Sequence, residues 1–99
     1  MMRLPKLEDV VIKANARYFF LQGYISGDTY DRVFKWLDGE EDKEIQRVVV
    51  NWMKRDAAWI DEVAPAIMER FRFAAPVIRR LVEHIRKLIL SRIRELEGG

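Results

Sequence analysis

The sequence predicts an all-α protein, a compact bundle of about five helices that ends in a long amphipathic helix. Apolar side chains recur at the three- and four-residue spacing of a helix along nearly the whole chain, and no segment shows the strict alternation of a strand. Glycines, prolines and short polar residues supply the breaks. With 99 residues, the chain is expected to form one domain, residues 1–99, of the small size at which stability is marginal without a partner.

The first helix is expected over residues 7–22, with Gly23 as its left-handed end. One apolar stripe lies within an arc of about 100° and is expected to face the core. Its members are Leu7, Val10, Val11, Ala14, Tyr18 and Leu21. Ile12, Ala16 and Phe19 form a second stripe on another side. A helix with two apolar sides is expected to be sandwiched in the bundle or to meet another chain.

Four further helices are expected, over residues 27–38, 42–63, 65–73 and 76–96. Ser26 is placed to cap the helix over residues 27–38, which ends at Gly39. In the third, Asp56 falls in the apolar stripe, so either the helix breaks near Arg55 or Asp56 faces other protein. Pro65 and Pro76 each follow an alanine, and a residue before proline disfavours the α conformation. Each proline is therefore expected to begin a new helix.

The helix over residues 76–96 carries a basic face opposite its aliphatic one. Residues 70–99 hold eight basic and three acidic side chains, whereas residues 1–69 hold ten and thirteen. The basic face consists of Arg79, Arg80, Arg86, Lys87 and Arg94. Such a row of cations is expected to contact the phosphates of DNA or RNA or an acidic partner, including a second copy. The alternative is a solvated surface of a purely structural oligomer.

Several side chains depart from their helical patterns and indicate contact with a partner. Arg92 projects from the aliphatic arc of the last helix, and it is expected either to pair with an acid, Asp56 being the best candidate, or to lie in a frayed helix end. The remaining apolar surface exceeds what a five-helix monomer needs. We expect a homo-oligomer, or a subunit of a larger complex, with an interface that contains Ile12, Phe19, Trp36, Leu90 and Arg92.

Catalytic candidates are few. The only histidine, His84, follows Arg79 by five residues, and this spacing resembles the Arg-x4-His signature of HEPN-type ribonucleases. The resemblance implies an all-α dimer in which paired Arg79 and His84 cleave RNA. The sequence otherwise contains no cysteine, no metal-ligand motif and no phosphate-binding glycine loop, so no cofactor, metal or small-molecule ligand is predicted.

These patterns predict a non-enzymatic assembly protein, with the ribonuclease and the purely structural oligomer as alternatives. Its apolar runs are too short to cross a membrane, so we expect no membrane contact and a cytoplasmic or virion location. Thirty-four charged side chains stand against seven Asn, Gln, Ser and Thr. That excess of charge is typical of thermophilic proteins.

Overall fold

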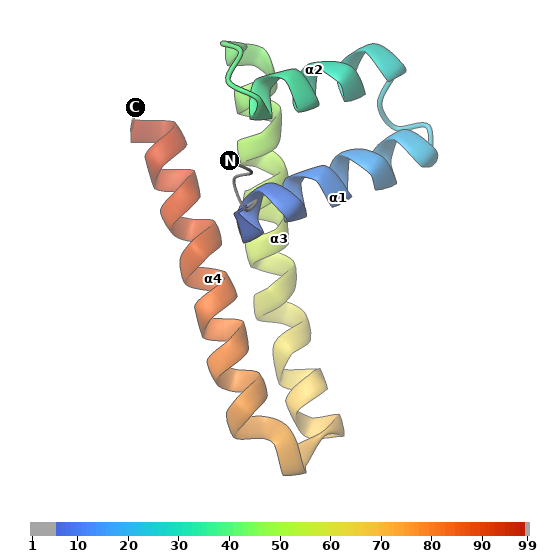
Figure 1. The fold of residues 1–99 in the computed structure, drawn as a ribbon. Helices are drawn as coiled ribbons and strands as arrows, with labels where there is room; N and C mark the ends of the chain where they lie inside the picture. Colours follow the sequence, from blue (N-terminus) through green and yellow to red (C-terminus); the bar gives the residue numbers. More distant parts are fainter. Residues whose placement is uncertain (1–5, 99) are drawn as a thin grey trace, which may run out of the picture. The chain divides into compact units, whose positions relative to one another are not determined.

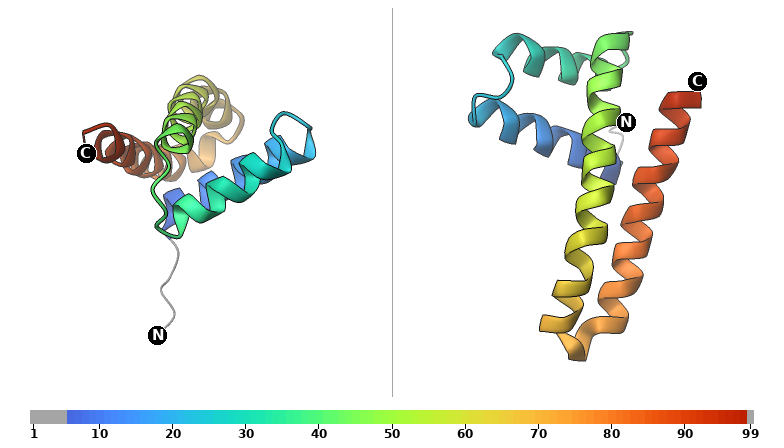
Figure 2. Two further views of the ribbon diagram at one scale, coloured as in Figure 1. Left: turned by 90° about the horizontal axis from the view of Figure 1, so that it is seen from above. Right: turned by 180° about the vertical axis from the view of Figure 1, so that it is seen from behind.

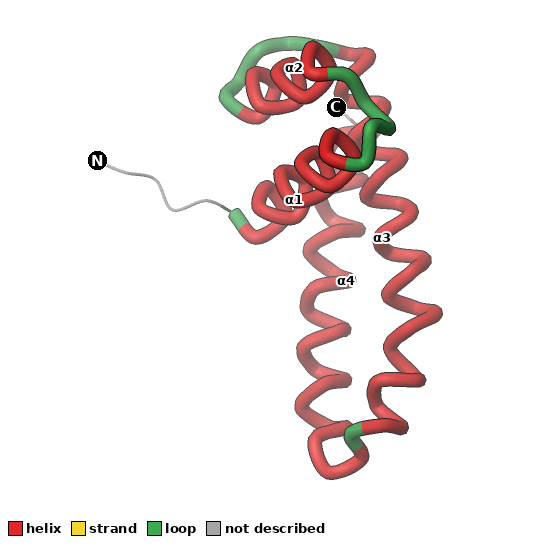
Figure 3. Tube along the Cα trace, turned by 90° about the vertical axis from the view of Figure 1, so that its right-hand side faces the viewer, coloured by secondary structure: helices red, strands yellow, loops and turns green. Residues whose placement is uncertain are grey.

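The computed structural model describes residues 6–98, which are almost entirely helical and contain no strand (Figures 1 and 3). The elements are α1 (Leu7–Leu21), α2 (Gly27–Leu37), α3 (Lys43–Arg70), the short 3-10 helix η1 (Arg72–Ala74) and α4 (Ala75–Gly98). The all-α prediction is confirmed. The described residues form four α-helices, however, where about five were expected.

The chain divides into two compact units, and the boundary between Trp52 and Met53 lies inside α3. The first unit contains α1, α2 and the beginning of α3. The second contains the rest of α3, η1 and α4.

In the first unit, α1 and α2 pack side by side as an antiparallel pair (Figure 2). Gly23 ends α1 with a φ of 76°, a left-handed conformation that glycine adopts without steric cost. The Ser26 hydroxyl then caps α2 by accepting a hydrogen bond from the Thr29 backbone N–H at 3.1 Å. Both predictions for this turn are confirmed, because they depended on local chemistry alone.

The orientation of α1 differs from the prediction. Ile12 and Ala16, from the second stripe, are fully buried. The stripe expected to face the core instead leaves Leu7, Val10, Tyr18 and Leu21 between 45% and 79% exposed. Periodicity could not choose between two apolar sides.

The α3 helix runs without interruption through Asp56 and Pro65, so the predicted helices over residues 42–63 and 65–73 are one element. Proline removes the hydrogen bond to the carbonyl four residues earlier, here that of Asp61. Both Asp61 and Pro65 are exposed, so water can satisfy the freed carbonyl. Pro76 does stand in the first turn of α4, as predicted, where a missing N–H costs no helical bond.

Candidate interaction surfaces

The second unit is a helical hairpin. The residues of α3 after Trp52 run antiparallel to α4, with η1 at the turn (Figure 1). Two ion pairs join the helices: Lys54 Nζ lies 3.0 Å from Glu97 Oε1, and Asp61 Oδ1 lies 2.9 Å from Arg86 Nε. From the first pair to the second, the residue number rises by seven on α3 and falls by eleven on α4, as expected for antiparallel helices. The row of buried apolar residues in the hairpin consists of Met53, Ala57, Ala64, Ile89 and Ile93.

One side of this hairpin exposes large apolar side chains from both helices. Trp59 and Ile67 from α3, with Val77 and Leu81 from α4, are between 39% and 69% exposed, and Val63 and Leu88 are half-buried. A helix turns by about 100° per residue. On each helix, the exposed set is therefore rotated from the buried row in the same sense, by about 100° on α3 and about 120° on α4. Because the two helices are antiparallel and face each other, this common rotation places both sets on one side. We call these six residues the hairpin face.

The basic face of α4 is mostly free of ion pairs. Arg79, Arg80, Lys87 and Arg94 are exposed and form no ion pair with any residue between 6 and 98. The fifth predicted cation, Arg86, is bound to Asp61 across the hairpin. We call the four free cations the basic ridge. On the α4 wheel the centre of the ridge lies about 120° from the centre of the hairpin face, so one surface can be covered while the other stays open.

The turn between α3 and α4 is both aromatic and basic. Phe71 and Phe73 lie edge to face with their ring centroids 6.4 Å apart, and Phe73 is 88% exposed. Arg70 and Arg72 flank them, and both are exposed. The sequence pattern predicts a short helix over residues 65–73 and no interaction surface. The surface was missed because it depends on α3 ending at Arg70, which leaves Phe71 and Phe73 in a turn.

The predicted interface residues are mostly covered by the chain itself. Ile12 is fully buried, so its place in an oligomer interface is corrected: no side-chain surface is left for a partner. Phe19, Trp36, Leu90 and Arg92 are half-buried. Phe19 packs against Trp52 with ring centroids 5.1 Å apart.

Arg92 does not lie in a frayed end, because α4 continues to Gly98. Its Nη1 donates to Glu95 Oε1 at 3.1 Å within the same helix. Pairing of Arg92 with Asp56 stays a prediction, and so does the contribution of Phe19, Trp36, Leu90 and Arg92 to an interface.

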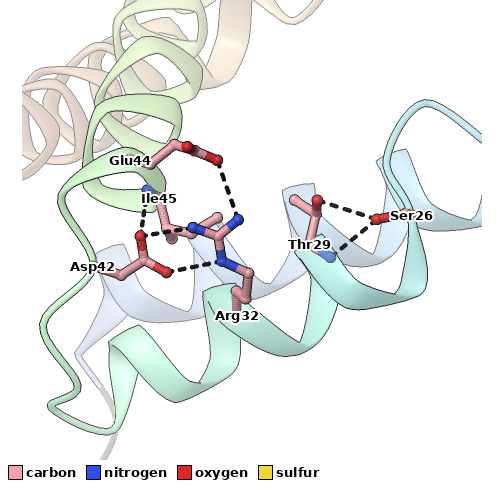
Figure 4. A network of polar contacts seen from close by, with 6 residues as sticks. All are labelled: Ser26, Thr29, Arg32, Asp42, Glu44 and Ile45. Carbon is pink, nitrogen blue, oxygen red and sulfur yellow. Dashed lines mark hydrogen bonds and ion pairs between the residues drawn. The ribbon is translucent and has the colours of Figure 1, made fainter.

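A separate cluster of charges anchors α3 to α2 within the first unit (Figure 4). Arg32 donates from Nε and Nη2 to the two oxygens of Asp42, at 2.9 and 3.0 Å, and from Nη1 to Glu44 at 3.1 Å. Asp42 Oδ1 also accepts the backbone N–H of Ile45 at 3.1 Å, which caps α3. The hydrogen bonds from Arg32, and then that from Ile45, lower the pKa of Asp42 below its ordinary value.

This lowered pKa predicts an acid-sensitive contribution to stability. A carboxyl group whose pKa is lower in the folded than in the unfolded chain stabilises the fold above the unfolded pKa, about 3.9. The contribution is lost as the pH falls through the folded pKa. In urea unfolding, the midpoint of the wild-type protein should therefore drop between about pH 5 and pH 2.5 by more than that of Asp42→Asn, which keeps a cap but does not titrate.

Asp38→Asn is the matched control, since Asp38 is exposed and forms no ion pair within the described chain. Its acid sensitivity should equal that of the wild-type protein. Equal pH dependence of Asp42→Asn and the wild-type protein would contradict the role of Asp42.

The catalytic candidates do not converge on one side of α4. Arg79 and His84 are both exposed, and a separation of five residues places them about 140° apart around the helix. No group of three metal-ligating side chains occurs in residues 6–98. Over the same residues, no helix has the length and apolar character needed to cross a membrane.

The sequence matches no known family model, no curated protein and no solved structure.

Proposed function

We propose that this protein is a non-enzymatic assembly module that pairs with a second copy through the hairpin face and contacts the backbone of nucleic acid through the basic ridge. The observation that carries the proposal is the hairpin face itself. Its exposed apolar residues come from two neighbouring helices, and exposed apolar patches of a few hundred Å² often mark sites of protein contact. The second unit itself contains no further α-helix besides the two of the hairpin.

The size of the hairpin face fits a second copy. With large side chains of about 150–250 Å² each, the exposed fractions of its members amount to about 400–500 Å² of apolar surface. Each partner in an interface of standard size contributes about 800 Å², of which about 60% is apolar, or about 480 Å². The apolar surface available therefore matches one side of such an interface.

A second copy also supplies the right geometry. Two hairpins related by a two-fold axis would bring four helices together around a common apolar core, the arrangement of a four-helix bundle. The same patch then serves both partners, because a two-fold interface is self-complementary. The basic ridge, on a different side of α4, stays accessible in that dimer.

Free cations on one helix support the nucleic-acid part of the proposal. Each of Arg79, Arg80, Lys87 and Arg94 can neutralise a phosphate and release a condensed counterion. None has to give up an ion pair with a described residue to do so. A dimer doubles the number of such cations and presents them as two symmetric rows.

Self-association is tested by replacing Val77 and Leu81 together with serine. These are the most exposed α4 members of the hairpin face, and the double variant should remain monomeric at concentrations where the wild-type protein is a dimer. Size-exclusion chromatography with light scattering measures the mass, and far-ultraviolet circular dichroism checks that the helices remain. The proposal fails if the wild-type protein is monomeric at high micromolar concentration, or if the double variant dimerises equally well.

Glu83→Ser is the matched control, because Glu83 is exposed on the same helix, two residues beyond Leu81 and outside the hairpin face. It changes helix propensity in a similar way without removing apolar surface. Its mass should be that of the wild-type dimer.

A further inference from the structure

The end of the hairpin exposes two phenylalanine rings where no fold requirement places them. Phe73 is 88% and Phe71 46% exposed, and the rings contact each other edge to face. Burying a phenylalanine side chain stabilises a fold through the hydrophobic effect. Leaving Phe73 in water forgoes nearly all of that gain, so the ring is available to a ligand.

The backbone of this turn holds the rings in place. The Phe71 N–H donates to the Ile67 carbonyl at 3.0 Å, and the Ala74 N–H donates to the Phe71 carbonyl at 3.0 Å. The 3-10 helix that carries Phe73 leads directly into α4. A ring presented by a hydrogen-bonded turn loses less conformational entropy on binding than one on an unstructured loop.

Four arginines surround this aromatic pair along the chain: Arg70, Arg72, Arg79 and Arg80, all exposed. Their only ion pair with a described residue joins Arg72 to Glu69 at 4.0 Å, at the limit of such a contact, and Glu69 is the only acid between residues 67 and 81. Every cation here is a guanidinium. Its planar fork binds phosphate with two hydrogen bonds and also stacks on flat π-systems, which the ammonium of lysine does not.

We propose that the hairpin end, defined as Phe71, Phe73, Arg70 and Arg72 with Arg79 and Arg80, binds single-stranded nucleic acid by stacking an unpaired base on Phe73 while the arginines hold the flanking phosphates. This deepens the proposed function and rests on its nucleic-acid part. Exposed rings among cations are the chemistry by which single strands are bound without sequence preference. A duplex offers the same phosphates, but its base faces are already stacked on one another.

Fluorescence anisotropy with a labelled oligothymidine and a labelled duplex of equal length tests the proposal. The wild-type protein should bind the single strand more tightly than the duplex at equal salt. Phe73→Ala should weaken single-strand binding about 5- to 150-fold, the range for loss of one stacked base, and leave duplex binding unchanged. Phe73→Trp should restore the affinity, and Phe73→Leu should not, because leucine is apolar but has no ring face.

Tyr24→Ala is the matched control. Tyr24 is another exposed aromatic residue, in the turn of the first unit, and its loss should change neither affinity. A parallel co-sedimentation with phosphatidylglycerol vesicles distinguishes a lipid surface. Vesicle binding that Phe73→Leu retains, together with equal single-strand affinities of the wild-type protein and Phe73→Ala, would overturn the proposal.

The remaining outcomes separate this inference from the proposed function. Equal affinity for single strand and duplex, insensitive to Phe73, overturns the stacking site and leaves the basic ridge as the contact. Absence of binding to both overturns the stacking site together with the nucleic-acid role of the ridge. In either case the light-scattering measurement still decides self-association.

Discussion

Replacing Ile12 with alanine is expected to lower the free energy of unfolding by about 2–5 kcal/mol, the range for truncating a fully buried isoleucine. The side chain is 0% exposed, so the variant loses both its transfer free energy and the packing around the cavity it leaves. Val10→Ala, two residues earlier at 46% exposure, should cost less than about 1 kcal/mol. Urea unfolding followed by far-ultraviolet circular dichroism measures both.

This pair tests the orientation of α1 directly, because the sequence pattern alone places Val10 inside and leaves Ile12 for a partner. A larger loss for Val10→Ala than for Ile12→Ala would contradict the structure. The measurements must use equal protein concentrations, since the stability of a dimer depends on concentration. A loss for Ile12→Ala that persists at concentrations where the wild-type protein is monomeric would place Ile12 in the core of the single chain.

Changing the four ridge residues Arg79, Arg80, Lys87 and Arg94 to glutamine is expected to have the largest effect on nucleic-acid affinity. Each phosphate contact contributes about 0.9 to the slope of log affinity against log salt for duplex DNA, so the slope should fall by about 3 to 4 for each row of the dimer that contacts the DNA. Fluorescence anisotropy over about 50 to 200 mM salt measures it. The dimer mass should be unchanged, because the ridge lies away from the hairpin face.

Arg86→Gln is the control within the same helix. Arg86 is already bound to Asp61, so replacing it should change the slope by less than the contribution of one free cation, about 0.9. If the wild-type protein binds neither duplex nor single strand at about 50 mM salt, the ridge is a solvated surface and the protein is a purely structural oligomer. An effect of Arg86→Gln equal to that of Lys87→Gln would show that the ion pair does not persist in solution.

Features governed by residues close together in the chain could be predicted. The helical class follows from the spacing of apolar residues, and the turn from Gly23 to Ser26 follows from one left-handed glycine and one hydroxyl cap. The positions of the basic residues on α4 follow in the same way, because a regular helix converts sequence spacing into angle. Each of these depends on at most a few turns of backbone.

Features governed by packing between helices could not be predicted from the sequence. The wheel of α1 has two apolar sides, and only the packed chain buries Ile12 and leaves Val10 in water. Pro65 reads locally as a helix start, yet α3 continues through it because the lost hydrogen bond lies on an exposed side. In the sequence, Arg86 is one of five similar cations. Only the folded hairpin places its Nε 2.9 Å from Oδ1 of Asp61, a residue twenty-five positions earlier.

The surfaces proposed for function also differ in whether the sequence alone could predict them. The basic ridge is a property of one helix, so the spacing of its residues in the sequence is enough to assign them. The hairpin face and the hairpin end each require α3 and α4 to be antiparallel neighbours and α3 to end at Arg70. Spacing along the chain sets which residues share a helix side, whereas which side is left uncovered depends on where the neighbouring helices lie, and only the tertiary structure decides that.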